Sequence, residues 1–168
     1  MRVLVTAASK HGSTDEMASA IGRALTDAGL ECDVRPMHEL AGVAGWNAVV
    51  LGSGVYMGRW LPEATEFVER HSVELAARPV WLFSSGPVGS PDPKPEGDPQ
   101  GIGELVAAIG ARGHRVFAGR LDRDQLGMGE RLIVAAVRAP DGDFRDWDAL
   151  TAWAGEIATE LKPAAVGG

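Results

Sequence analysis

Short apolar runs alternate with amphipathic stretches along most of the chain. The runs that are typical of buried strands are RVLVTA (2–7), ECDVRPM (31–37), NAVVLGS (47–53), PVWLFSS (79–85) and HRVFAG (114–119). Apolar residues at helical spacing follow them. These stripes are Met17, Ile21, Leu25 and Ala28; Leu61, Ala64, Phe67, Val68 and His71 in a helix over about 61–75; Ile102, Leu105, Val106 and Ile109; and Trp147, Leu150, Ala154, Ile157 and Leu161. The pattern predicts repeated strand-helix units.

Strands that are apolar throughout belong to a parallel sheet covered by helices on both faces, so we predict an α/β doubly wound fold with five parallel strands. The segment GERLIVAAVRA (129–139) fits either a sixth strand or a buried helix, and the strand-helix alternation favours a helix. Asp143 is available as the N-cap of the last helix. Ligands of such folds bind at the carboxyl ends of the strands, where the winding direction reverses.

Composition narrows the class of protein. The 168 residues, 45% hydrophobic and 23% charged, suit one domain, which we expect over 1–163 with a short tail at 164–168. The net charge of −7 argues against nucleic acid and favours basic protein partners. Cys32 is the single cysteine, and neither a signal peptide nor a membrane-spanning run is evident, so we expect a cytoplasmic protein. Peripheral membrane contact and the oligomeric state stay open.

The loop after the first strand, TAASKHGSTDEMA (6–18), has more small and hydroxylated residues than a turn needs. Backbone N–H groups at a helix N-terminus, with short hydroxyls beside them, bind phosphate. The loop has no lysine of the Walker type, so it favours a terminal phosphomonoester such as that of FMN. Alternatively, Ser13 and Glu16 form a capping box and need no ligand. The candidate phosphate residues are Ser9, Lys10, His11, Gly12, Ser13 and Thr14.

Two further loops, after the third and fourth strands, offer a place for a flat ring. The first frames it with Gly54, Val55, Tyr56, Met57 and Gly58, and Tyr56 is the residue we expect to stack; Trp60 either faces the ring or packs under the next helix. The second leads into a Pro-rich and Gly-rich rim at 90–100. Its candidates are Ser84, Ser85, Gly86, Pro87, Val88 and Gly89.

These loops give the chain a resemblance to the flavodoxin-like proteins over nearly its whole length. Their phosphate-loop pattern, aromatic-x-Ser/Thr-x-x-Gly-x-Thr, is matched by Ser9, Gly12 and Thr14, with Ala7 at the aromatic position. The resemblance implies FMN as cofactor and the strand order 2-1-3-4-5. The segments GSGVYMG, FAGRLDRDQ and GDFRDWDAL are similar to the group of menaquinone-dependent protoporphyrinogen dehydrogenases. That group has a longer, basic and aromatic segment after strand five, whereas this chain has no aromatic residue there.

The resemblance implies an FMN-binding oxidoreductase or electron-transfer protein, related to protoporphyrinogen or quinone-linked dehydrogenases, with a redox protein or a quinone as partner. The flavin would carry the chemistry, so no catalytic side chain is expected. The acidic composition should lower the potential of the flavin. His38, His71 and His114 lack metal-ligand spacing, and no metal is predicted. The alternative is a non-catalytic module that has lost the flavin and acts through protein contacts.

Overall fold

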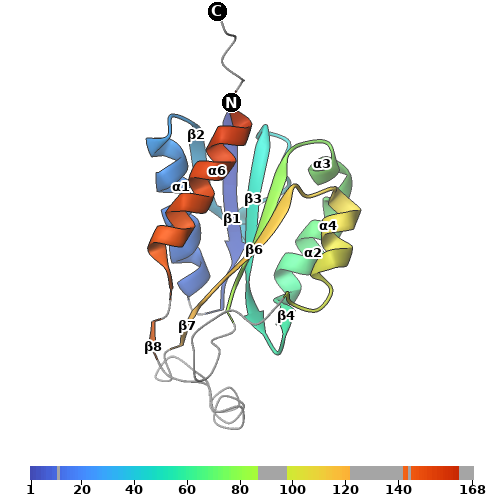
Figure 1. Cartoon of the computed structure of the whole chain (residues 1–168). Helices are drawn as coiled ribbons and strands as arrows, with labels where there is room; N and C mark the ends of the chain where they lie inside the picture. Colours follow the sequence, from blue (N-terminus) through green and yellow to red (C-terminus); the bar gives the residue numbers. More distant parts are fainter. Residues whose placement is uncertain (11, 87–97, 122–141, 144, 163–168) are drawn as a thin grey trace, which may run out of the picture.

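The computed structural model describes residues 1–10, 12–86, 98–121, 142–143 and 145–162 (Figure 1). Its centre is a sheet with the strand order β2-β1-β3-β5-β6, and these five strands are parallel. Their bounds are β1 Arg2–Ala8, β2 Glu31–Pro36, β3 Ala48–Tyr56, β5 Val80–Ser85 and β6 Gly113–Phe117. In chain order this is 2-1-3-4-5, so the predicted doubly wound fold is confirmed.

Helices cover both faces of the sheet, as Figure 1 shows. On one face lie α1 (Ser13–Asp27) and α6 (Trp147–Leu161), which contact each other. On the other lie α2 (Pro62–Arg70), α3 (Ser72–Ala76), α4 (Ile102–Ile109) and the short 3-10 helix η1 (Met37–Glu39). A two-residue strand, β4 (Arg59–Trp60), pairs antiparallel with the end of β3. Another small pair joins β7 (Arg120–Leu121) and β8 (Gly142–Asp143).

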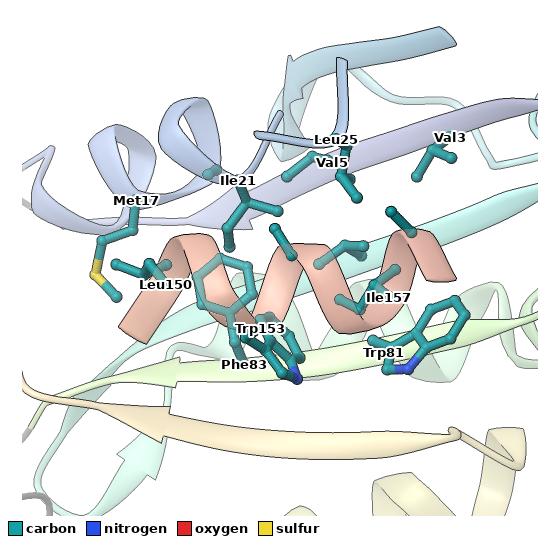
Figure 2. Packing of buried hydrophobic residues seen from close by; sticks show 14 of the residues in the cluster. Val3, Val5, Met17, Ile21, Leu25, Trp81, Phe83, Leu150, Trp153 and Ile157 are labelled. Atoms are coloured by element: carbon teal, nitrogen blue, oxygen red, sulfur yellow. The ribbon is translucent and has the colours of Figure 1, made fainter. Parts of the chain in front are cut away.

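Each face has its own apolar cluster, because successive side chains of a strand point to opposite sides. Figure 2 shows the cluster under α1 and α6, where Phe83 and Trp153 meet edge to face with 6.1 Å between ring centroids. The second cluster joins α2, α3 and α4 to the sheet through residues such as Leu51, Leu75 and Leu82, all fully buried. Both faces of the central strands β1, β3 and β5 are therefore buried, as their uniformly apolar sequences predicted, whereas the edge strands β2 and β6 are partly exposed.

The structure corrects three boundaries. The helix predicted over 61–75 is broken at His71 (φ −109°, ψ 22°), where the buried ring packs on Phe67 with 4.6 Å between centroids. The third strand runs on to Tyr56 instead of ending at 53, because β4 turns back and pairs with it. These tertiary contacts override the local pattern.

The third correction concerns the start of α6. The N-cap is Asp146, whose carboxylate accepts a hydrogen bond from the Ala149 N–H (3.0 Å), whereas Asp143 lies in β8. Trp147 is 39% exposed and stacks on Arg145 (4.5 Å), so the buried stripe begins at Leu150. Residues 129–139, for which a helix was favoured over a strand, lie outside the described residues.

Gly22 in α1 and Gly155 in α6 form a matched pair for testing how closely α1 packs on β2. A Cβ at Gly22 would lie 2.3 Å from Cγ2 of Val34, whereas one at the exposed Gly155 would meet nothing within 4 Å. We expect Gly22→Ala to lower the free energy of unfolding by about 1–3 kcal/mol through overpacking. Gly155→Ala should raise it by about 0.5–1 kcal/mol through helix propensity. Urea denaturation measures both, and a stabilising Gly22→Ala would contradict the close packing.

Candidate functional site

The register of the sheet brings the ends of three strands together. Ala8 of β1 pairs with Ser53 of β3, Gly54 pairs with Ser85 of β5, and Ser85 pairs with Phe117 of β6. The loops after β1, β3 and β5 therefore leave the same edge of the sheet, at the lower end of Figure 1. This is the edge where parallel α/β sheets bind their ligands.

The loop after β1 is shaped around Gly12. This residue is the N-cap of α1 in the left-handed conformation (φ 85°), which a residue with a Cβ adopts only at a cost. Its N–H donates a hydrogen bond to Oγ of Ser9 (2.9 Å), so Ser9 fixes the turn. His11 lies outside the described residues.

Ser13 is the first residue of α1, and its hydroxyl is the most informative atom of this loop. Ser13 Oγ is buried and has no hydrogen-bond partner among the described residues. A buried polar atom without a partner costs roughly 1–3 kcal/mol, so such atoms are rare in native proteins. Ser13 lies in the first turn of a helix whose N-terminus carries no side-chain cap. Helix ends of this kind are common anion-binding sites in proteins.

The capping-box alternative for this loop is wrong. The N-cap position belongs to Gly12, and no side chain caps the helix, so Ser13 and Glu16 do not close a box. Instead, the Glu16 carboxylate pairs with the guanidinium of Arg145, whose side chain is only 5% exposed. The ion pair offsets one of the two acidic charges in the first turn of α1. Burial raises the pKa of the other, Asp15, and the nearby His38 opposes that rise.

Thr14 and Gly54 bring the loops after β1 and β3 into contact. Thr14 is 3% exposed, and its Oγ1 lies 3.3 Å from the position that a Cβ on Gly54 would occupy. A side chain at Gly54 would crowd the Thr14 hydroxyl. Gly54 therefore keeps a narrow space open beside the first turn of α1.

The loop predicted over 52–60 is a tight hairpin between β3 and β4. Met57 and Gly58 are its two central residues, and both have positive φ (56° and 76°), which is typical of a type I′ turn. Tyr56 is half-buried at the base of the hairpin, and the Lys10 ammonium lies 4.3 Å from its ring centroid. Lys10 thus connects the phosphate loop to the residue predicted to stack on a ring. Val55 is partly buried against the core.

The end of β5 holds Ser84, Ser85 and Gly86, while Pro87, Val88 and Gly89 lie outside the described residues. Gly86 has positive φ (83°), and its N–H donates to the Phe117 carbonyl (2.8 Å). The Ser84 hydroxyl is fully buried and is hydrogen-bonded to the Trp60 indole N–H and to His114 Nε2, both at 2.7 Å. For Trp60, which is 5% exposed, the packing alternative is correct.

Sequence reasoning missed two parts of this region. The contact from Ser84 to His114 joins residues 30 positions apart, and the Arg145–Glu16 pair joins residues 129 positions apart, so no local spacing reveals either. Cys32, the single cysteine, lies in β2, away from these loops, where burial and the neighbouring Asp33 raise the pKa of its thiol to about 11. In the part of the chain that the structure describes, no cluster of three potential metal ligands occurs. No described helix has the length and apolarity to cross a bilayer.

The residues present fit a phosphomonoester and a flat ring. An unpartnered hydroxyl, a left-handed glycine and an uncapped helix end meet at α1, while Tyr56 and the end of β5 lie along the same sheet edge. Ser9, Gly12, Ser13 and Thr14, predicted to hold a phosphate, lie together at the start of α1. The hairpin and the segment from Ser84 to Gly86, predicted to hold a ring, lie at the ends of β3 and β5.

Comparisons with known proteins point the same way. Protoporphyrinogen IX dehydrogenase [quinone] of Escherichia coli strain K12 is 27% identical over 86 residues, which cover 50% of this chain and 48% of that protein. This chain thus aligns with about half the length of its curated relatives. A flavodoxin from the domain Archaea superimposes with a TM-score of 0.65 at 18% identity over 97% of this chain and all of that one. Rubredoxin oxygen:oxidoreductase of Desulfovibrio gigas also scores 0.65 at 16% identity, covering 95% of this chain and 36% of that one.

The family model of the flavodoxin domain matches residues 4–148, a span that contains all three loops of the site. Oxidised flavodoxin 1 from Bacillus cereus shares the fold as well, with a TM-score of 0.63 at 16% identity over 96% of this chain and all of that one. The resemblance seen in the sequence is confirmed, and with it FMN as the implied cofactor. The chain belongs to the flavodoxin domain family.

Proposed function

We propose that this chain is an FMN-dependent electron-transfer protein or oxidoreductase, whose residues 1–163 act as one FMN-binding domain. FMN, when bound, supplies the electron or hydride chemistry. The protein's residues bind the phosphate, orient the ring and exclude water from part of it. The observation that carries the proposal is the buried Ser13 hydroxyl in the first turn of α1, which has no hydrogen-bond partner among the residues that the structure describes.

The phosphate end of the site combines four features of this chain. The N–H groups of the first turn of α1 and the Ser13 hydroxyl face an uncapped helix end. Ser9 holds Gly12 in its left-handed conformation. Thr14 presents its hydroxyl beside the space that Gly54 leaves open. A phosphate bound here would accept a hydrogen bond from the Ser13 hydroxyl, which has no partner in the described part of the chain.

The ring end of the site lies between the β3–β4 hairpin and the end of β5. Tyr56 offers an aromatic face. The Gly86 N–H and the Gly58 carbonyl are already paired with the Phe117 carbonyl and the Gln100 N–H, so a ring edge would pair with other backbone groups of the hairpin and of the end of β5. Lys10 covers one face of Tyr56. A ring that stacks on Tyr56 therefore takes the opposite face or displaces the Lys10 ammonium.

A quinone-linked dehydrogenase is the more specific form of this proposal. The matched Escherichia coli proteins carry that activity in their names, but the alignment covers 48% of their length. The chain also lacks aromatic residues over 120–142, where the dehydrogenase group is aromatic and basic. Reduction of the protein-bound flavin by NADH, NADPH and a quinol, measured in parallel, separates a dehydrogenase from a plain electron carrier.

FMN binding itself is tested by titration. We expect the fluorescence of FMN to be quenched as the purified apoprotein is added, and the purified holoprotein to be yellow. The rival function, a flavodoxin-fold module that works only through protein contacts, predicts unchanged FMN fluorescence at saturating protein. That outcome would remove the proposed function.

Ser13→Ala tests the phosphate site because it separates ligand binding from stability. Loss of a hydrogen bond to a charged phosphate should weaken FMN about 10- to 100-fold. Riboflavin has no phosphate, so its dissociation constant should not change. The apoprotein should be as stable as before or more so, because a buried hydroxyl without a partner is removed.

Ser9→Ala is the matched control. Ser9 fixes the turn at Gly12, so this variant should lower both the melting temperature and FMN affinity. Fluorescence titration with both flavins and thermal unfolding of the apoprotein measure these effects. Equal losses of FMN and riboflavin in Ser13→Ala, or a less stable apoprotein, would sink the phosphate assignment.

Lys10→Met tests the charge near the ring. Removing an ammonium from beside Tyr56 should lower the reduction potential of the bound flavin, because a nearby cation favours electron uptake. FMN affinity should fall no more than about fivefold, the upper end of the range measured for solvent-exposed ion pairs. Lys162→Met removes the same charge just beyond α6, at the opposite end of the molecule (Figure 1). It should change neither quantity, and equal shifts in both variants would show only an effect of net charge.

A further inference from the structure

A chain of four side chains runs through the core behind the ring end of the site. The Trp60 indole N–H of β4 donates to Ser84 Oγ of β5 (2.7 Å), and Ser84 Oγ is 2.7 Å from His114 Nε2 of β6. His114 Nδ1 lies 3.3 Å from Oδ1 of Asp98, which precedes α4. Trp60, Ser84 and the His114 side chain are buried, and the Asp98 side chain is 68% exposed. The chain therefore begins in the core and ends at solvent.

The directions of these hydrogen bonds follow from what each group can donate. An indole N–H only donates, so Ser84 Oγ accepts from Trp60. The Ser84 hydroxyl then has one hydrogen bond to donate, and His114 Nε2 is the acceptor within reach. His114 is then neutral and carries its proton on Nδ1, which donates to the Asp98 carboxylate. Burial lowers the pKa of His114 although Asp98 opposes the shift, which agrees with a neutral ring. Every group in the chain is satisfied in this one arrangement.

Serine, histidine and aspartate in this order also occur in hydrolases, but hydrolysis does not fit here. The Ser84 side chain is fully buried, so a substrate cannot reach Oγ. The same oxygen accepts the Trp60 N–H, which makes it a poorer nucleophile. The chain is better suited to holding elements in place than to attacking a substrate.

The elements that the chain joins are those predicted to frame the ring. Trp60 lies in the return strand of the Met57–Gly58 hairpin, and the Gly58 carbonyl accepts from the Gln100 N–H (2.8 Å). Ser84 lies directly before Ser85 and Gly86 at the end of β5. His114 thus connects the hairpin and the end of β5 to the segment that enters α4.

We propose that His114 is a positioning residue for the flavin ring: by accepting a hydrogen bond from the Ser84 hydroxyl, it holds the β3–β4 hairpin at a fixed position relative to the end of β5. The inference rests on the proposed FMN function. It assigns to His114 a role in ring binding, while the first turn of α1 binds the phosphate.

Two substitutions at His114 separate its two hydrogen bonds. The carboxamide of His114→Gln reaches the Nε2 position and can accept from Ser84, whereas that of His114→Asn lies near the Nδ1 position and can only keep Asp98. We expect His114→Gln to keep riboflavin and FMN affinity within about threefold. In His114→Asn the Ser84 hydroxyl loses its acceptor, so the hydrogen bond from Trp60 no longer fixes the hairpin. The affinities for FMN and riboflavin should fall equally, by about 5- to 50-fold.

The controls distinguish positioning from general destabilisation. Ile109→Val trims a buried side chain of α4 and lowers stability, but it should leave both dissociation constants unchanged. Ser13→Ala should weaken FMN alone. If the wild-type chain binds no flavin, the proposed function fails; if it binds flavin and His114→Asn binds as tightly, only the present inference fails.

A second measurement needs no flavin. In the apoprotein, the nitrogen shifts of the His114 ring should report a neutral imidazole with its proton on Nδ1. The Trp60 indole N–H should exchange slowly with solvent, and this protection should be kept in His114→Gln and lost in His114→Asn. A ring protonated on Nε2 at neutral pH would overturn the proposed chain, because Ser84 would then have no acceptor in it.

Discussion

The register of β3 against its two neighbours determines where every part of the site lies. β3 is the strand that meets both β1 and β5, with Ser53 opposite Ala8 and Gly54 opposite Ser85. A shift of one residue would turn each side chain to the other face of the sheet. Gly52 helps to fix this register, because a Cβ there would lie 2.2 Å from the Phe83 ring. Phe83 fills that space and packs on Trp153 of α6.

Stability and ligand binding are opposed at the start of α1. A capping side chain would satisfy the first N–H groups, yet the N-cap is a glycine, and the Ser13 hydroxyl next to it is buried without a partner. Both features cost stability in the absence of a ligand. At α6, by contrast, the Asp146 carboxylate caps the helix by accepting a hydrogen bond from the Ala149 N–H. The two helices lie side by side, and the difference is the one expected if α1 binds an anion as proposed.

The sequence was sufficient for the strands and their order, because these depend on local patterns and on a family resemblance. The phosphate loop stays a prediction. The sequence was insufficient where long-range contacts decide. The break at His71 depends on its packing with Phe67, and the hairpin at Met57 depends on β4 pairing back onto β3. Ser84 was predicted at the ring, but its hydroxyl turns inward to Trp60 and His114, which no spacing along the chain indicates.

Net charge alone is a coarse guide to the electrostatics of the proposed site. The total of −7 led to the expectation of a lowered flavin potential. Salt screens exposed charges beyond a Debye length of about 8 Å, so acids on distant helices act weakly on the ring. Closer groups matter more. Lys10 lies 4.3 Å from the Tyr56 ring, Glu16 is paired with Arg145, and burial raises the pKa of Asp15 although His38 opposes the rise. The potential at the proposed site therefore depends on these nearby groups more than on the total charge, and the lowered flavin potential expected from the composition stays a prediction.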